Sequence, residues 1–276
     1  MILGIDGGNH KVKVVGPNGA VDFYSNIGEA RERRLESEFG SDDMTVEYDG
    51  RTMFAGSLAK FECEFGSTMM GSTKNHPDGK MRILLAMFRY SPESVYALVV
   101  GQPICQHTAA EKQAIKDMLL GRHRIAVNGQ ERLLVVQRVE VAAGPSAALW
   151  AAPKKGLRRV IDPGSGTTNC GTLIDMKKID KESFTIPFGV DSTISKDLSA
   201  MAEGIARYTS KTWHRDDPVE VIGGKALEIL PYIQEHYPRA VVFRPVIYIG
   251  GQAQELHPVY ANAAGFYAIA RRLYNG

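Results

Sequence analysis

Residues 161–168 read Ile-Asp-Pro-Gly-Ser-Gly-Thr-Thr, and residues 5–9 read Ile-Asp-Gly-Gly-Asn. In both stretches an apolar strand ends at an aspartate, the chain turns on glycine, and another strand follows. More than half of the 276-residue chain separates Asp6 from Asp162. Because each half opens with the same unit, the sequence predicts two similar α/β domains that face each other.

The two turns have the composition of phosphate-binding loops. Backbone N–H groups in a turn of glycine and small polar residues can converge on one anion. The hydroxyls of Ser165, Thr167 and Thr168 can donate further hydrogen bonds. Asp6 and Asp162 would repel a phosphate unless a divalent cation lay between them, and Mg²⁺ accepts one or two carboxylates together with phosphate oxygens. The pair of turns therefore predicts a clamp for a polyphosphate with Mg²⁺.

Two other nucleotide-binding motifs are excluded. After Gly164-Ser165-Gly166 the position of a third Rossmann glycine is Asn169, and a strand rather than a helix is predicted to follow. A Walker loop requires Ser or Thr after its lysine, and Gly224-Lys225-Ala226 and Gly79-Lys80-Met81 lack it.

A third glycine site lies near the C-terminus. Val246–Ile249 is predicted to be a buried strand, and it ends in Gly250 and Gly251, followed by Gln252. A diglycine lets a flat ligand such as an adenine ring approach the backbone. We therefore predict that this segment contacts the nucleoside.

Composition gives no case for a membrane or nucleic-acid surface. The 44% hydrophobic and 23% charged fractions are those of an ordinary globular protein, and the formal net charge of +2 is nearly balanced. Three cysteines without C-x-x-C spacing argue against a disulfide framework or a zinc site. There is no signal-peptide pattern and no apolar run near the ~20 residues that span a bilayer. The expected location is the cytoplasm.

Local signals place the main elements. Asn18-Gly19 and Asp49-Gly50 predict tight hairpin turns. Helical spacing predicts helices over 108–120, with Thr108 as N-cap, over 192–208 and over 261–274.

The order of these motifs resembles the actin, heat-shock-chaperone and sugar-kinase superfamily. Residues 5–11 resemble its first phosphate motif, 161–168 its second, and 246–253 its adenosine motif. Residues 141–148 and 262–267 resemble its two connecting helices. Within the superfamily, the chain is most similar to bacterial actin-like plasmid-segregation proteins of the ParM and AlfA type.

The resemblance implies two RNase-H-like domains around a nucleotide cleft. The first would span 1–152, with an insert subdomain over about 31–90, and the second 153–276. It implies that the cleft binds ATP, with GTP as an alternative. Asp6 and Asp162 would be the catalytic residues and would hold Mg²⁺ through water, and Lys11 would reach the phosphates. The remaining nucleotide-binding residues that it implies are Gly7, Gly8, Asn9, His10, Gly164, Ser165, Gly166, Thr167, Thr168, Gly189, Lys196, Asp197, Gly250, Gly251 and Gln252.

The sequence departs from the family in two places. Actin-like proteins usually carry Gln or Glu in the first connecting helix to orient the attacking water, and the matching residue here is Gly144. Either Glu140 or Ser146 replaces it, or hydrolysis is slow. Only Ser210–Pro238 leaves room for the outer subdomain of the second half, which we therefore expect to be reduced or absent.

Three functions fit these observations. The first is a filament-forming ATPase of a DNA-segregation cytoskeleton, which binds copies of itself and a DNA-binding adaptor protein rather than DNA or a membrane. The second is a small-molecule kinase on the same fold, which would need a catalytic base in the first half. The third is a nucleotide-bound scaffold that hydrolyses negligibly.

Overall fold

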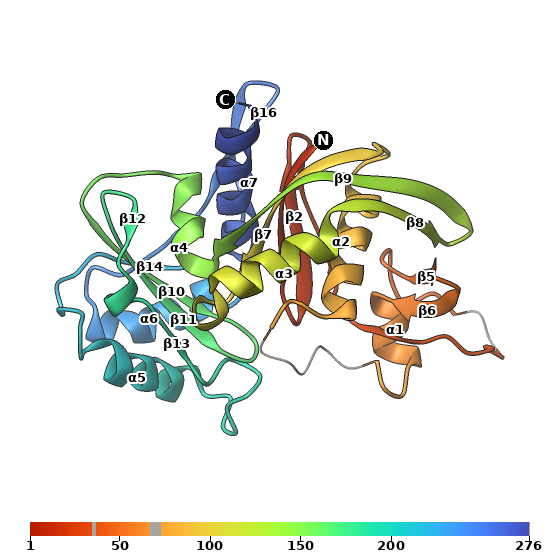
Figure 1. Ribbon diagram of the computed structural model, residues 1–276. Coiled ribbons are helices and arrows are strands. Elements are labelled where there is room, and N and C mark those ends of the chain that lie inside the picture. Colours follow the sequence, from red (N-terminus) through yellow and green to blue (C-terminus); the bar gives the residue numbers. More distant parts are fainter. Residues whose placement is uncertain (35–36, 67–72, 276) are drawn as a thin grey trace.

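The computed structural model describes residues 1–34, 37–66 and 73–275, and Figure 1 shows two halves, each built on its own sheet. The sheet of the first half has the strand order β3-β2-β1-β7-β9-β8-β5-β6-β4. Its strands are β1 (Ile2–Gly7), β2 (Lys11–Gly16), β3 (Gly19–Tyr24), β4 (Ile27–Glu29), β5 (Met44–Tyr48), β6 (Arg51–Ala55), β7 (Val95–Gln102), β8 (Gly121–Val127) and β9 (Gln130–Ala143).

The strand pairing brings the ends of three strands to one edge. β1 runs parallel to β7, with Ile5 opposite Val100, and β7 runs parallel to β9. The carboxyl ends of parallel strands lie together, so the first turn, Gln102 and Ala143 meet there. β2 and β3 complete the predicted meander, and the hairpin turns at Asn18-Gly19 and Asp49-Gly50 are confirmed.

Four helices accompany this sheet: α1 (Ser57–Glu62), α2 (Pro77–Tyr90), α3 (Ala109–Leu119) and α4 (Gly144–Ala148). α2 buries Leu84, Leu85 and Met87 in the core under β1 and β2. The Thr108 hydroxyl accepts a hydrogen bond from the backbone N–H of Glu111 at 3.2 Å, which confirms the predicted N-cap of α3.

The sheet of the second half has the order β12-β11-β10-β14-β15, with β13 paired to β11. Its strands are β10 (Leu157–Pro163), β11 (Thr168–Ile174), β12 (Lys177–Lys178), β13 (Phe184–Ile186), β14 (Val219–Val221) and β15 (Val241–Val242). Two helices, α5 (Leu198–Thr209) and α6 (Ala226–His236), pack against each other and bury Met201, Ile205, Ile229 and Ile233 in the core of this half.

The prediction of a helix over 192–208 is wrong in its first part. Residues 189–197 form a turn, because Lys196 has φ 52°, which no helix accepts, and the Asp197 carboxylate caps α5 by accepting from the Ser199 N–H at 2.9 Å. The expected loss of the outer subdomain is confirmed: residues 210–218 alone connect α5 to β14, and β14 and α6 belong to the sheet and its cover.

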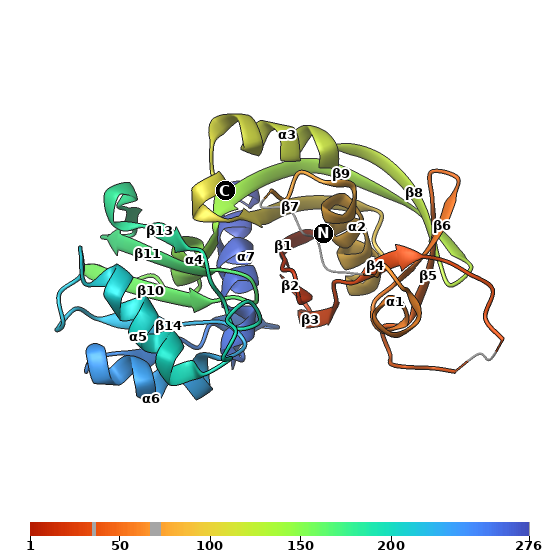
Figure 2. The ribbon, with the colours of Figure 1, turned by 90° about the horizontal axis from the view of Figure 1, so that it is seen from below.

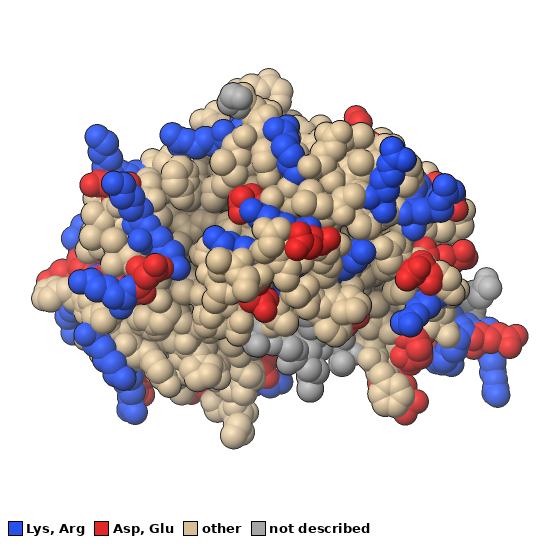
Figure 3. All heavy atoms as spheres, viewed as in Figure 1, with Lys and Arg blue, Asp and Glu red and all other residues tan. Residues whose placement is uncertain are grey.

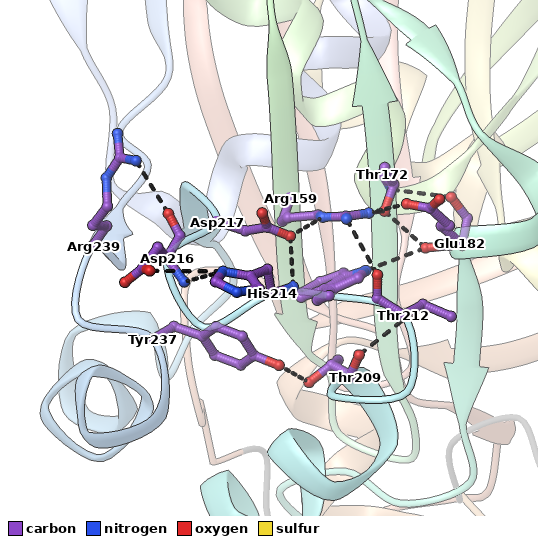
Figure 4. Close-up of polar contacts among 12 residues, drawn as sticks. Arg159, Thr172, Glu182, Thr209, Thr212, His214, Asp216, Asp217, Tyr237 and Arg239 are labelled. Atoms are coloured by element: carbon purple, nitrogen blue, oxygen red, sulfur yellow. Dashed lines mark hydrogen bonds and ion pairs between the residues drawn. The ribbon is translucent and has the colours of Figure 1, made fainter.

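A buried guanidinium holds this half together (Figure 4). Arg159 is 5% exposed; it forms an ion pair with Asp217 at 2.9 Å and another with Glu182, and it donates to the Thr172 hydroxyl at 2.6 Å. Ion pairs and hydrogen bonds of this kind offset the cost of burying the charge. The cluster fixes the loop after α5 to the sheet, because Arg159 of β10 contacts Thr212 and Asp217 of that loop.

α7 (Ala261–Tyr274) joins the two halves. Figure 2 shows it between the two sheets, and its small residues Ala263, Ala264 and Gly265 let it pack closely against β1, β7 and α4. It follows a two-stranded hairpin of β16 (Val246–Ile249) and β17 (Gln252–Glu255). Among residues 1–34, 37–66 and 73–275, none of the helices has the length and apolarity that crossing a membrane requires.

Candidate functional site

A cavity of about 510 Å³ lies between the two glycine turns. Both halves and the start of α7 contribute to its wall. The predicted residues that line it are Asp6, Gly8, Asn9, His10, Lys11, Asp162, Gly164, Ser165, Gly166 and Thr167. The structure therefore brings together most of the two predicted phosphate loops, although they are far apart in the sequence.

The two aspartates occupy equivalent positions, each near the end of the first strand of its half. Lys13 lies 3.7 Å from the Asp6 carboxylate. The Asp162 carboxylate accepts a hydrogen bond of 2.8 Å from the Asn262 amide. Burial raises the pKa of Asp162 to about 6, and the nearby charge of Asp6 adds to this effect while the bond from Asn262 opposes it. Two neighbouring carboxylates, one of them buried, form a site that a cation would stabilise.

The first turn holds several cationic or polar side chains at the cavity. Lys11 forms an ion pair with Asp22 at 2.6 Å, so it must leave this partner, or share it, to reach a phosphate. His10 packs edge-on against Tyr24, and burial lowers its pKa, which favours the neutral imidazole. Gly7 lies behind the cavity, where its carbonyl accepts a hydrogen bond from Lys74.

The second turn is braced from behind by the loop of residues 189–197. The N–H groups of Val190 and Asp191 donate to the carbonyls of Gly164 and Ser165, each at 2.8 Å. A Cβ on Gly189 would lie 2.3 Å from the Gly164 carbonyl oxygen, so only glycine fits there. Gly189 thus supports the turn and lies outside the cavity lining.

Three predicted residues next to these loops also lie outside the cavity. Thr168 is fully buried, and its hydroxyl donates to the Phe188 carbonyl at 2.9 Å. Lys196 and Asp197 are exposed at the start of α5, where Asp197 caps the helix. The structure thus gives Thr168 and Asp197 local roles in the fold.

The segment that we predicted to contact the nucleoside does not line the cavity. Gly250 and Gly251 form the tip of the β16–β17 hairpin, Gln252 begins β17, and Tyr248 is 58% exposed, so β16 is not the buried strand we expected. The diglycine that does line the cavity is Gly223-Gly224, which follows the buried strand β14. The same signal, a β-branched strand ending in two glycines, is present there in the sequence.

Lys74 is a cavity residue that the sequence did not indicate. Its ammonium donates to the Gly7 carbonyl at 2.8 Å and to the Asn9 side chain at 3.1 Å. Burial lowers its pKa to about 8, and the charge of Asp6 opposes this effect. Lys74 lies just before α2, 65 positions from Asn9, and no local motif marks it.

The position of Gly144 is as predicted, at the cavity and without a side chain. Neither proposed substitute lines the cavity: Glu140 forms an ion pair with Lys116 at 2.8 Å, and Ser146 is buried in α4. Gln102, at the end of β7, does line it. Its side chain is held between the Lys74 backbone N–H at 3.3 Å and the Glu111 carboxylate at 3.4 Å.

Comparison with known proteins agrees with this architecture. A filament of AlfA bound to AMPPNP matches 100% of this chain and 98% of its own, at 22% identity and TM-score 0.77. A filament of AlfA from a B. subtilis plasmid matches 100% and 99%, at 21% identity and TM-score 0.78. An archaeal actin homologue matches 99% of both chains, at 19% identity and TM-score 0.79. At these identities the likeness establishes the fold.

No curated protein matches this chain in sequence. The family model described as the N-terminal domain of actin-like proteins matches residues 4–146, which is more than half of the chain. With two sheets around a cleft, paired Asp–glycine turns and this match, the chain belongs to the family of actin-like proteins and has the bacterial ParM and AlfA type of fold.

Proposed function

We propose that this protein binds ATP with Mg²⁺ in the cleft, hydrolyses it, and uses the nucleotide to control assembly into filaments. One observation carries the proposal: Asp6 and Asp162, each followed by a glycine turn, line the same cavity from opposite halves. A ligand that bridges the turns also bridges the halves, so its phosphates can set how the halves are held.

The residues of the cleft fit a metal-bound polyphosphate. Asp6 and Asp162 would hold hydrated Mg²⁺, which would neutralise charge on the phosphate oxygens. Backbone N–H groups around Gly8 and Ser165 would bind those oxygens. Lys74 and Lys11 would supply positive charge from the first half, and Gly223-Gly224 would lie against the nucleoside.

Gln102 is the residue we propose to hold the attacking water. Gly144 has no side chain to do so, and Glu140 and Ser146 are directed elsewhere. An amide can accept a hydrogen bond from water and donate one to the phosphate. Gln102 lies on the first half near Gly144, and Lys74 and Glu111 restrict its orientation.

The alternative functions receive less support. A metabolite kinase needs a base at its substrate hydroxyl. Asp78, the aspartate that the sequence offers within residues 60–110, lies at the start of α2 beside His76, outside the cavity lining. The argument for a scaffold that does not hydrolyse ATP rests on Gly144, and it is weakened because Gln102 offers a side chain to hold the attacking water.

The cellular task we propose is DNA segregation through an adaptor protein. On the face in Figure 3 both signs of charge are interspersed, so the filament itself offers no basic stripe for DNA on that face. An adaptor would supply the DNA contact.

The binding proposal is tested by titrating fluorescent ATP and GTP analogues with Mg²⁺ into the wild type, Asp6→Ala and Asp162→Ala. We expect saturable binding that each substitution weakens at least tenfold and that EDTA reverses. Equal binding by all three proteins would refute the assigned site. A burst of ADP that depends on an added sugar or acid would instead support the kinase.

A further inference from the structure

Ile194 is an apolar side chain fully exposed to solvent. Its exposed fraction of 103% is the largest among the exposed large hydrophobic residues that the structure describes. It lies in the loop of residues 189–197, between β13 and α5. Covering such a side chain removes apolar surface from water, so a partner that buried it would gain affinity.

The same loop is bonded to the second phosphate turn. Besides the two backbone hydrogen bonds from Val190 and Asp191, the Ser192 hydroxyl donates to the Gly166 carbonyl at 3.0 Å. Asp191 also lines the nucleotide cavity. A shift of the turn on binding phosphate would therefore be passed to the loop and to Ile194.

A second cavity, of about 360 Å³, lies between α7 and the β16–β17 hairpin. We call it the α7 groove. Its wall is largely aromatic and aliphatic, and it includes Trp150, Ile247, Tyr248, Ala264, Tyr267 and Ala268. Tyr248 is 58% exposed, so the groove is open to another molecule.

The loop and the α7 groove lie at opposite ends of the molecule. In Figure 1 the segment between β13 and α5 hangs at the lower edge, whereas β16 and the C-terminal end of α7 stand at the upper edge. Figure 2, seen from below, shows this segment in front of α7, so both lie near one axis. In Figure 3 the lower edge ends in an uncharged projection at the place of this segment. A copy displaced along this axis would bring its loop to the groove.

The charges of the two surfaces are also complementary. Arg271 and Arg272 border the groove, and neither takes part in an ion pair among the described residues. The loop carries the carboxylates of Asp191 and Asp197 and the ammonium of Lys196, which leaves one net negative charge. Attraction between the surfaces would favour this orientation over the approach of two grooves.

We propose that the loop of residues 189–197 docks into the α7 groove of a second copy, with Ile194 buried against the groove's aromatic wall. A contact between two different surfaces at opposite ends does not close on itself, so it repeats as a filament. This inference rests on the proposed filament function and adds the contact surfaces and their link to the phosphate turn.

The test uses one variant at each surface. Ile194→Asp removes the apolar contact, and Ala268→Glu fills the groove while keeping a good helix former. Leu120→Asp, at an exposed apolar residue of the first half that belongs to neither surface, is the control. With ATP–Mg²⁺ we expect each surface variant to lose at least tenfold in sedimentable polymer, and the control to match the wild type.

Mixing the variants makes the test specific. Ile194→Asp retains a groove and Ala268→Glu retains a loop, so an equimolar mixture should form 1:1 dimers in analytical ultracentrifugation, while each variant alone stays monomeric. Polymer from either variant alone, or no dimer in the mixture, would overturn the contact. A wild type that binds ATP but never assembles would overturn the filament function and this contact together. Retained ATP binding by both variants would show that the nucleotide site is intact.

Discussion

The Asn262 amide donates a hydrogen bond of 2.8 Å to the carboxylate of Asp162. Asn262 lies in the first turn of α7, a helix that packs mainly on β1 and β7 of the first half, whereas Asp162 lies near the end of β10 in the second half. The bond therefore connects the halves at the point where the metal is proposed to bind. The Asn262 side-chain oxygen has no partner among the described residues and remains able to accept a bond from water.

Replacing Asn262 with Leu should weaken binding of ATP–Mg²⁺ by about tenfold or more, because a hydrogen bond to a charged group contributes about 1.5–3 kcal/mol. Its loss also removes an interaction that favours the charged form of Asp162. The measurement is a titration with a fluorescent ATP analogue, with Gln252→Leu on the hairpin as control. If both substitutions leave the affinity unchanged, the bond has no role in binding.

The two diglycines allow a matched comparison. Gly223 has φ 94°, and a Cβ there would lie 2.8 Å from the Asp162 carboxylate, so Gly223→Ala should reduce nucleotide affinity at least tenfold. Gly250 also has positive φ, at 57°, but its added Cβ would meet nothing within 4 Å. Gly250→Ala should therefore lower stability slightly and leave the affinity within about twofold. The reverse pattern in the titrations would return the nucleoside site to the hairpin.

Gln102→Ala should slow phosphate release by about 100-fold, because correctly placed groups of this kind contribute roughly 10²–10⁴-fold. Nucleotide affinity should change less than threefold, since we assign Gln102 to the water. Single-turnover phosphate release measures the effect. Glu140→Ala, which removes the ion pair with Lys116 and a hydrogen bond from the Val141 N–H but no group that lines the cavity, is the control. An unchanged rate for Gln102→Ala, or a large loss for Glu140→Ala, would contradict the assignment.

The pKa of Lys74, lowered to about 8, predicts a pH dependence of nucleotide binding. Below pH 8 the ammonium is charged and attracts phosphate. Above pH 8 the free protein loses this proton, so binding must take a proton up, and affinity should fall about tenfold between pH 7 and pH 9. Lys74→Met should bind more weakly at pH 7 and lack this part of the slope. An identical slope in both proteins would show that Lys74 does not titrate on binding.

The sequence predicted the features that depend on local pattern. The paired Asp–glycine turns, the hairpins at Asn18 and Asp49, and the missing outer subdomain all follow from short motifs or from chain length. The sequence could not tell which diglycine lines the cavity, because Gly223-Gly224 and Gly250-Gly251 follow similar strands, and the pairing of β14 with β10 brings the former to the cleft.

Residues contributed over long distances could not be predicted in this way. Lys74 and Gln102 come from the chain between the two turns, and they meet the cavity because β7 pairs with β1 and α2 packs beneath it. Helical spacing predicts Lys196 and Asp197 inside a helix over 192–208. The positive φ of Lys196, which periodicity does not reveal, moved them into a turn and a cap.

The most direct test of the central claim is right-angle light scattering of the purified protein after addition of ATP–Mg²⁺, with ADP–Mg²⁺ as the control. The account predicts a rise with ATP above a critical protein concentration, a smaller rise or none with ADP, and a decay as ATP is consumed. An unchanged signal with ATP over a wide range of protein and salt concentrations would contradict nucleotide-controlled assembly.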